Sequence, residues 1–163
     1  MATANKNLSS YDSTRVPHAG NMKIGLVVSD WNQEVTFAMC EAAIATLKRH
    51  GAEMDNIVVK HVPGAFELTL GAKLLAESDD FDAIICIGCV IQGETRHFEF
   101  ICQGVTQGIM QLNMAYNLPF VFGVLTTDNL EQAKDRAGGK HGNKGDEAAI
   151  TAIKMASLKA ELE

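Results

Sequence analysis

The sequence predicts an α/β protein in which a four-stranded parallel sheet lies between two layers of helices. Strand-like and helix-like segments alternate along the chain, an order that is typical of parallel strands joined by helical crossovers. Two of the strand-like segments are also almost wholly apolar, as strands covered on both faces are. Because such crossovers are right-handed, we expect a doubly wound sheet in the order 2-1-3-4.

The first half of the chain contains two predicted strands and two predicted helices. Residues 23–28 form a short strand rich in β-branched side chains, and residues 34–50 follow with apolar side chains at helical spacing. Gly51 stands where that helix should stop. Residues 57–62 form the second strand, and a helix is expected over about 65–77.

The third and fourth strands flank the longest predicted helix. Residues 83–91 are a continuous apolar run that reads as a buried strand, and a helix follows over about 95–116. Residues 119–125 form the fourth strand. Together the four strands and their helices predict a three-layer αβα sandwich of the flavodoxin-like type.

A glycine-rich segment, 138–145, separates two further helices, a short one ending near Ala137 and a last one beginning near residue 146. Asp128 or Asn129 is the expected cap of the short helix. The glycine-rich loop lacks the Gly-Lys-Ser/Thr pattern and the preceding strand of a nucleoside-triphosphate loop. No G-x-G-x-x-G follows the first strand either, so the sequence argues against dinucleotide binding.

Length and charge limit the functional classes. The 163 residues suffice for one domain, with 47% hydrophobic and 21% charged residues and a formal net charge of −6. We expect an amino-terminal arm over 1–21 and a single domain over 22–163. An acidic chain without a basic cluster or a long apolar run is not expected to bind nucleic acid or a membrane, and we expect it in the cytoplasm.

The cysteines are predicted to be structural. Cys86 and Cys89 have the spacing of a redox or metal pair, but they lie on a predicted strand, where residues three apart point to opposite faces. Cys40 and Cys102 stand alone, so no zinc site is completed. We therefore expect neither a metal nor cysteine chemistry.

The segment 88–97 is the richest candidate for chemistry, because ligands of such sheets bind beyond the carboxyl ends of the strands. A helix beginning near Thr95 would offer its free amides and the Thr95 hydroxyl to an anion. His97 would lie beside that anion, where a histidine can transfer protons near neutral pH. The alternative is that Thr95 only caps the helix and His97 is solvated.

Other side chains near the strand ends suggest a ring and a phosphate. Trp31, the single tryptophan, follows the first strand and is expected to be an exposed stacking surface rather than a core residue. Arg136 has the planar fork that suits phosphate, although many helical arginines are only surface charges. Phe66 and Phe122 are equally compatible with the core, and Glu67 with a helix-dipole role.

Four blocks of the sequence resemble the signature segments of lumazine synthases, in order, between residues 22 and 158. The blocks are Val62-Pro63-Gly64-Ala65-Phe66-Glu67, Gly88-Cys89-Val90-Ile91 with Gly93-Glu94-Thr95 and His97, Phe122-Gly123-Val124-Leu125-Thr126-Thr127, and Arg136-Ala137-Gly138 with Gly142-Asn143-Lys144-Gly145. The resemblance implies condensation of 5-amino-6-(D-ribitylamino)uracil with 3,4-dihydroxy-2-butanone 4-phosphate, giving 6,7-dimethyl-8-(1-D-ribityl)lumazine, phosphate and water, the penultimate step of riboflavin biosynthesis. It implies a transferase that needs no cofactor.

The resemblance also implies roles for particular residues. His97 is the implied acid and base. The implied pyrimidine and ribityl contacts are Trp31, Ala65, Phe66, Glu67, Cys89, Val90, Ile91, Phe122 and Lys144, and the implied phosphate contacts are Glu94, Thr95 and Arg136. Family members often have arginine where this chain has Gln92 and phenylalanine where it has Trp31. We expect altered local pairing from the first change and a larger stacking face from the second.

The resemblance implies a homopentamer whose sites lie between subunits, with Phe122, Arg136 and Lys144 supplied by the neighbour. Some members assemble twelve pentamers into an icosahedral shell, and riboflavin synthase is an implied partner. The short glycine-rich loop favours the shell, while the long arm with Pro17 weighs against it. Two alternatives stay open at this point: a non-catalytic flavin-binding or shell-forming relative, and a flavodoxin-like electron carrier.

Overall fold

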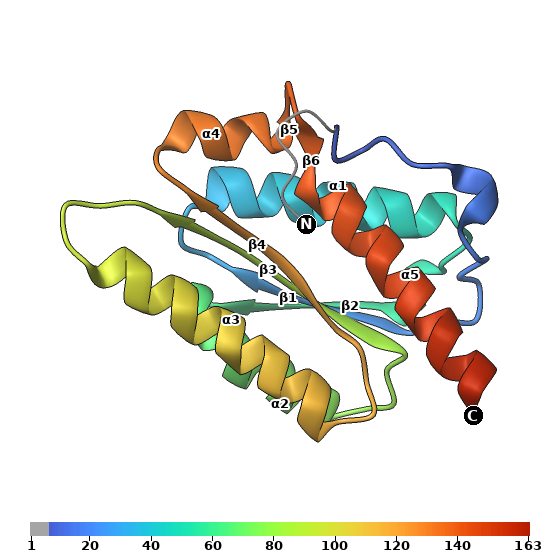
Figure 1. The fold of residues 1–163 in the computed structure, drawn as a ribbon. Coiled ribbons are helices and arrows are strands. Elements are labelled where there is room, and N and C mark those ends of the chain that lie inside the picture. Colours follow the sequence, from blue (N-terminus) through green and yellow to red (C-terminus); the bar gives the residue numbers. More distant parts are fainter. Residues whose placement is uncertain (1–6) are drawn as a thin grey trace.

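A computed structural model describes residues 7–163 of the chain, and it contains the predicted parallel sheet between two helical layers (Figure 1). The strand order is β2-β1-β3-β4, which confirms the predicted order 2-1-3-4. The strands are β1 (Ile24–Ser29), β2 (Ile57–Val62), β3 (Ala83–Ile91) and β4 (Phe120–Thr127). The helices are α1 (Gln33–Arg49), α2 (Leu68–Ala76), α3 (His97–Ala115), α4 (Leu130–Asp135) and α5 (Lys144–Leu162).

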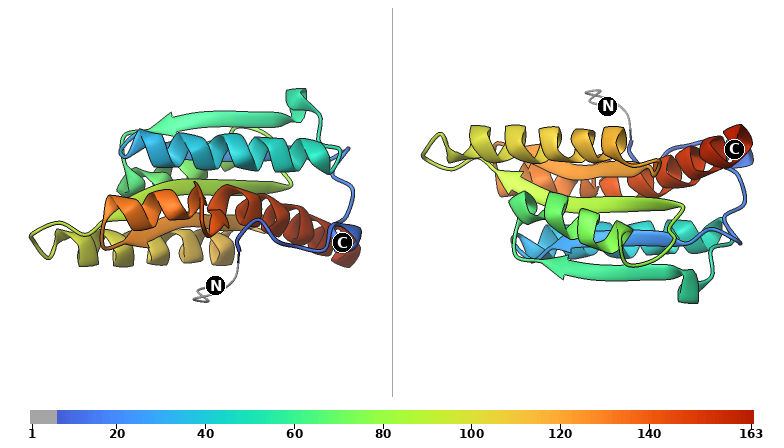
Figure 2. Two further views of the ribbon diagram at one scale, coloured as in Figure 1. Left: turned by 90° about the horizontal axis from the view of Figure 1, so that it is seen from above. Right: turned by 90° about the horizontal axis from the view of Figure 1, so that it is seen from below.

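Each face of the sheet carries its own hydrophobic core. Helices α1 and α5 cover one face, and α2 and α3 cover the other, as the views from above and below show (Figure 2). Met39 of α1 and Ile153 of α5 are fully buried in the first core, and Leu68 of α2 and Val105 of α3 in the second. Burial on both faces explains why the central strands are nearly continuous apolar runs.

Strand β3 is longer than its neighbour β1, and this difference opens the carboxyl edge of the sheet. The β1–β3 pairing ends at Val28 and Ile87, whereas β3 continues beside β4 to the pair Ile91–Thr127. Residues 88–91 therefore have a strand partner on one side only. After β1 the chain turns toward β2, because the amides of Asp30 and Trp31 donate to the carbonyls of Val62 and Pro63.

Several predicted boundaries move by one to three residues. The helix expected over 65–77 opens as the short 3-10 turn η3 (Ala65–Glu67), and α3 begins at His97 instead of Thr95. The segment predicted as a plain glycine-rich loop forms a small antiparallel hairpin, β5 (Ala137–Gly139) and β6 (Gly142–Asn143). Consequently α5 begins at Lys144, two residues earlier than expected. Asn129 caps α4 by accepting from the Gln132 amide at 2.9 Å.

The described part of the expected arm lies against the domain. A short 3-10 turn, η1 (Ser13–Arg15), is followed by Ala19, which is fully buried in the core beneath α1. The Tyr11 hydroxyl lies 3.1 Å from His50 Nε2 at the end of α1. Another 3-10 turn, η2 (Met54–Asn56), precedes β2. Residues 1–6 of the expected arm lie outside the described part of the chain.

The two cysteines of β3 point to opposite faces, as predicted. Cys86 packs in the core under α2 and α3, whereas Cys89 packs in the core under α1 and α5. Burial raises the pKa of each thiol to about 12. The four cysteines are free, and residues 7–163 contain no cluster of three or more metal-ligating side chains. None of the described helices has the length and apolar character needed to cross a membrane.

Candidate active site

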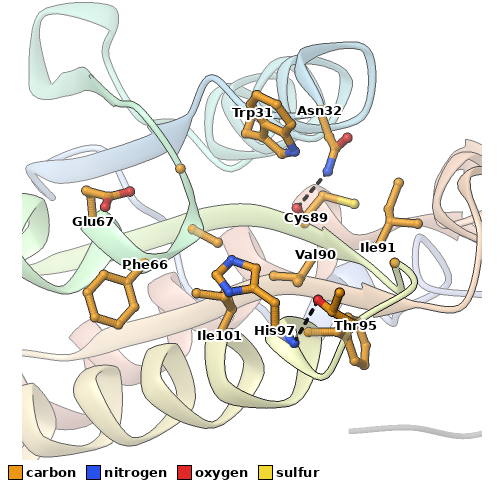
Figure 3. A pocket seen from close by; sticks show the side chains of 14 residues that line it. Trp31, Asn32, Phe66, Glu67, Cys89, Val90, Ile91, Thr95, His97 and Ile101 are labelled. Atoms are coloured by element: carbon orange, nitrogen blue, oxygen red, sulfur yellow. Dashed lines mark hydrogen bonds between the residues drawn. The ribbon is translucent and has the colours of Figure 1, made fainter.

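A cavity of about 640 Å³ lies at the carboxyl edge of the sheet, where β3 extends beyond β1 (Figure 3). Three segments form it: the turn after β1, the turn η3 after β2, and β3 with the start of α3. The lining residues are Trp31, Asn32, Gly64, Ala65, Phe66, Glu67, Cys89, Val90, Ile91, Gly93, Thr95, His97, Phe98 and Ile101. Nine of the thirteen residues proposed from the sequence thus line one cavity, although they come from three separate segments of the chain.

Trp31 forms one wall of the cavity, and its side chain is 70% exposed. The sequence-based expectation of an exposed aromatic surface at this turn is confirmed. The next residue, Asn32, is the one non-glycine residue of the described chain with a positive φ, at 62°. Its Nδ2 donates to the Cys89 carbonyl at 2.9 Å, which ties the turn after β1 to the unpaired part of β3. Asparagine tolerates this left-handed conformation better than most side chains.

The opposite wall comes from η3 and the first turns of α3. Ala65 is buried, whereas the Phe66 ring is 60% exposed and Glu67 is also exposed. Gly64 precedes the turn in an extended conformation, and a Cβ there would lie 3.1 Å from a Glu67 carboxylate oxygen. In Figure 3, Phe66 and His97 lie on the α3 side of β3, and Trp31 lies on the α1 side. A flat ligand could therefore lie between aromatic surfaces.

The floor of the cavity is the backbone of residues 89–91. These residues hydrogen-bond to β4 on one side and have no strand on the other. Asn32 occupies the Cys89 carbonyl and the Val90 main chain faces β4, so the main chain of Ile91 is the part of this edge that remains for a ligand. Such an edge can recognise a ring by pairing with its amide-like groups, in the manner of an added strand.

His97 is the first residue of α3, and its ring points into the cavity (Figure 3). The Thr95 hydroxyl accepts from the His97 amide at 3.4 Å, so Thr95 does contact the helix start although Arg96 is the cap residue. The Glu99 amide also donates to the Arg96 carbonyl at 3.1 Å, so an anion at this helix start would use the Phe98 amide or displace one of these two contacts. The arrangement places a titratable imidazole, a hydroxyl and a helix amino terminus within one short segment.

Four residues named from the sequence do not line this cavity: Glu94, Phe122, Arg136 and Lys144. Glu94 is exposed in the loop before α3, and Phe122 is half-buried in the core under α2 and α3. Arg136 ends α4, where its guanidinium donates to the Gln132 carbonyl at 3.1 Å. Lys144 begins α5, and its Nζ lies 2.8 Å from a Glu147 carboxylate oxygen.

Sequence reasoning missed five lining residues: Asn32, Gly64, Gly93, Phe98 and Ile101. Phe98 and Ile101 have the helical spacing of the buried side of α3, and the structure leaves both half-buried where that side meets the cavity. Asn32 follows the single tryptophan, and an asparagine just before a helix is a recognisable turn signal. Its bond to β3 depends on a residue 57 positions away and has no local signature.

The fold and the cavity define a class of protein: an αβα sandwich with an aromatic-walled ligand site and an exposed histidine at the carboxyl edge of a parallel sheet. The family model of 6,7-dimethyl-8-ribityllumazine synthase matches residues 21–160. The chain belongs to the 6,7-dimethyl-8-ribityllumazine synthase family.

Individual relatives agree over nearly the whole chain. The protein named 6,7-dimethyl-8-ribityllumazine synthase from Parabacteroides distasonis is 58% identical over 160 residues, which cover 98% of this chain and 100% of the relative. A protein of the same name from Porphyromonas gingivalis is 56% identical, covering 97% of this chain and 98% of its own. One from Phocaeicola vulgatus is 54% identical, covering 100% and 97%.

Proposed function

We propose that this chain is a lumazine synthase, which condenses 5-amino-6-(D-ribitylamino)uracil with 3,4-dihydroxy-2-butanone 4-phosphate. Membership of the family supports the reaction. The observation that carries it is structural: Trp31 and His97, distant in sequence, line one cavity at the carboxyl edge of the sheet. A stacking surface and a proton-transferring group in one site are what this condensation needs.

The pyrimidine would lie on the Trp31 indole with its polar edge against the backbone of residues 89–91. The Ala65–Glu67 segment lies on the side from which a ribityl chain would extend, and the exposed Glu67 carboxylate can accept hydrogen bonds from its hydroxyls. Phe66, 60% exposed within the cavity, would cover the apolar side of that chain.

The phosphate of the second substrate would bind at the start of α3. The donors would be the Thr95 hydroxyl and the amides of the helix start, of which those of His97 and Glu99 would first have to leave their present partners, and Arg136 would add a guanidinium. Glu94 lies in the same loop, and its backbone amide is the group available to phosphate because its carboxylate would repel the anion.

His97 would move the protons of the reaction. The 5-amino group attacks the ketone and water leaves, which forms an imine. Removal of a proton from the adjacent carbon then expels phosphate, and the ribitylamino nitrogen closes the second ring with loss of another water. Because the substrate supplies both nucleophiles, the protein needs to position the substrates and to transfer protons through one group. The reaction as written consumes no cofactor.

A homopentamer would complete the site. Five large apolar side chains on the outer surface of α2 and α3 are more than half exposed: Leu70, Leu74, Phe100, Met110 and Met114. A surface of this kind is typical of a subunit interface. A head-to-tail ring would let Phe122, Arg136 and Lys144 of one subunit reach the cavity of the next. We further propose a cytoplasmic location, assembly of twelve pentamers into a shell, and riboflavin synthase as a partner.

The test is to mix the purified protein with both substrates and to follow lumazine formation by absorbance and fluorescence, with His97→Ala alongside. We expect rapid product formation, slowed by about 10²-fold or more in the variant. Equal rates in both proteins would remove His97 from the mechanism. If neither exceeds the uncatalysed background, the enzyme proposal fails, and riboflavin titration would then test a binding role.

A further inference from the structure

The amino-terminal arm lies directly on the β5–β6 hairpin. The Leu8 amide donates to the His141 carbonyl at 2.7 Å, and the Ser9 hydroxyl accepts from the Asn143 amide at 2.9 Å. The side chain of Asn7 shapes this part of the arm, since its Oδ1 accepts from the Ser9 amide at 2.8 Å. The arm thus bonds to both sides of the hairpin tip.

Gly142 shows how close the arm lies. Its φ is +78°, a conformation that favours glycine. A Cβ at this position would lie 2.2 Å from Asn7 Oδ1 and 2.7 Å from the Ser9 nitrogen. The arm therefore lies so close to Gly142 that any side chain at this position would collide with it.

The hairpin connects Arg136 and Lys144, the two cationic site candidates that do not line the cavity at the sheet edge. The Lys144 amide donates to the Arg136 carbonyl at 2.8 Å, which closes the base of the hairpin. Asn143 fixes its inner side, because Nδ2 donates to the Ala38 carbonyl of α1 at 3.2 Å and Oδ1 accepts from the Gly145 amide at 2.8 Å. On the side toward the arm, the Asn143 amide donates to the Ser9 hydroxyl.

We propose that Ser9, together with the Leu8 amide, is a positioning residue for Arg136 and Lys144, and that the arm fixes the half of the site presented to a neighbouring subunit. This inference rests on the proposed function, in which those two cations contact the substrates. Ser9 touches neither substrate. Its bond to Asn143 lies one peptide from Lys144, so movement of the hairpin is transmitted directly to the lysine and, through the backbone bond, to Arg136.

The experiment compares three variants of the full chain. Ser9→Ala removes the acceptor of the Asn143 amide, and Leu8→Pro removes the donor to His141. Ser10→Ala is the matched control, because the Ser10 amide bonds to the Asn7 carbonyl and its hydroxyl makes no hydrogen bond in the described structure. Hydrogen exchange of residues 141–145 reports the hairpin, and steady-state kinetics report the site.

We expect exchange at 142–145 to become about tenfold faster in Ser9→Ala, as loss of one hydrogen bond predicts, and faster still in Leu8→Pro. The KM for the butanone phosphate should rise about three- to tenfold with a smaller change in kcat, while Ser10→Ala stays like the unaltered protein. Unchanged exchange, or faster exchange with unchanged KM, would overturn the positioning role. Inactivity of the unaltered protein would instead overturn the proposed function and, with it, the role of Ser9.

Discussion

Two regions of this molecule carry the proposed substrate contacts, and they are built in opposite ways. The cavity region places Trp31, Phe66 and His97 at the surface, where their side chains make few contacts with the rest of the chain. The hairpin region places Arg136 and Lys144 among bonds to α4, α5 and their own backbone. The cavity region is open toward a ligand, whereas the side chains of the hairpin region are held by hydrogen bonds and an ion pair within the chain.

In the proposed pentamer, each copy of the chain would use these two regions differently, one to hold substrates and the other to complete the site of its neighbour. An open cavity needs a second surface to exclude water. The β5–β6 hairpin, with its two cationic residues, could provide that surface only to a chain other than its own. The exposed apolar side chains of α2 and α3 form a surface that such an arrangement would bury between subunits. A ring of identical subunits would place the hairpin of each against the cavity of the next.

The largest expected effect follows from preventing the association of subunits. Met110→Glu places a charge on the exposed apolar face of α3, where Met110 is 63% exposed. We expect a monomeric variant whose activity falls by at least about 100-fold, because the desolvated charge opposes contact and the site lacks its second half. Sedimentation and product formation measure both effects.

Met54→Glu is the control for that substitution, since Met54 is 51% exposed in η2 at the start of β2, the strand at the opposite edge of the sheet from β4. It should retain assembly and activity. A monomeric Met110→Glu protein with full activity would show that one chain contains the whole site.

A second test sharpens the comparison by separating its two regions. His97→Ala impairs the cavity region and Arg136→Ala the hairpin region, so each protein alone should lose about 10²-fold or more. When the two are unfolded, mixed in equal amounts and reassembled, random neighbours should restore about a quarter of the sites if each site uses two chains.

The readout is the specific activity of the mixture against that of the separately reassembled variants. Activity no higher than the average of the two would mean that both residues act within one chain. The comparison of the two regions would then describe one site, not two complementary surfaces.

The sequence predicted the buried strands and the exposure of Trp31 from local patterns, and the sheet order from the general handedness of parallel crossovers. The apolar run of β3 is long enough to identify without its neighbours. The β5–β6 hairpin was missed because its strands are only two and three residues long, and its pairing depends on the arm and on α1. The glycines in that segment are as typical of an irregular loop as of a short hairpin.

The candidate site was predictable to the same extent. Residues next to strand ends could be assigned to one edge of the sheet, since parallel strands end together. The link between Asn32 and Cys89 could not, because it joins two segments through a single side-chain bond. In the proposed pentamer, Arg136 and Lys144 would meet the cavity of a second chain, whose position no pattern within one chain can predict.

Asn32 offers a test within the cavity region. Asn32→Gly keeps the left-handed turn but removes the bond to the Cys89 carbonyl, so folding stability should change little. We expect the KM for the pyrimidine to rise about fivefold, which corresponds to loss of about 1 kcal/mol. The emission of Trp31, the single tryptophan, should shift and become more mobile.

Asn32→Asp is the companion variant, because it preserves shape while replacing the donor with an acceptor. It should be worse than glycine, since a carboxylate would face a carbonyl oxygen. Unaltered emission and KM in both variants would show that Asn32 does not orient the Trp31 turn.

The smallest expected effect concerns β3, the strand that both regions share. Burial raises the pKa of the Cys86 thiol to about 12 from an ordinary value near 9. The corresponding stability is fully present below pH 9 and is lost as the pH rises toward 12, because only the unfolded chain ionises in that window. The slope is at most about 1.4 kcal/mol per pH unit.

Urea unfolding between pH 8 and pH 10.5 measures this slope. Cys86→Ala should be less stable at pH 8 but should depend less on pH above 9. An identical pH dependence in the two proteins would assign the alkaline loss to other groups.

The unequal lengths of β1 and β3 have a consequence for how proteins of this architecture can change. Residues 88–91 of β3 extend beyond the β1 pairing, a distance of about 13 Å at the usual rise per residue. A longer β1 would fill that space, and a shorter one would enlarge it. Steps of two residues would preserve which side chains face each core. The size of the ligand can thus be altered at a strand end, without redesign of either hydrophobic core.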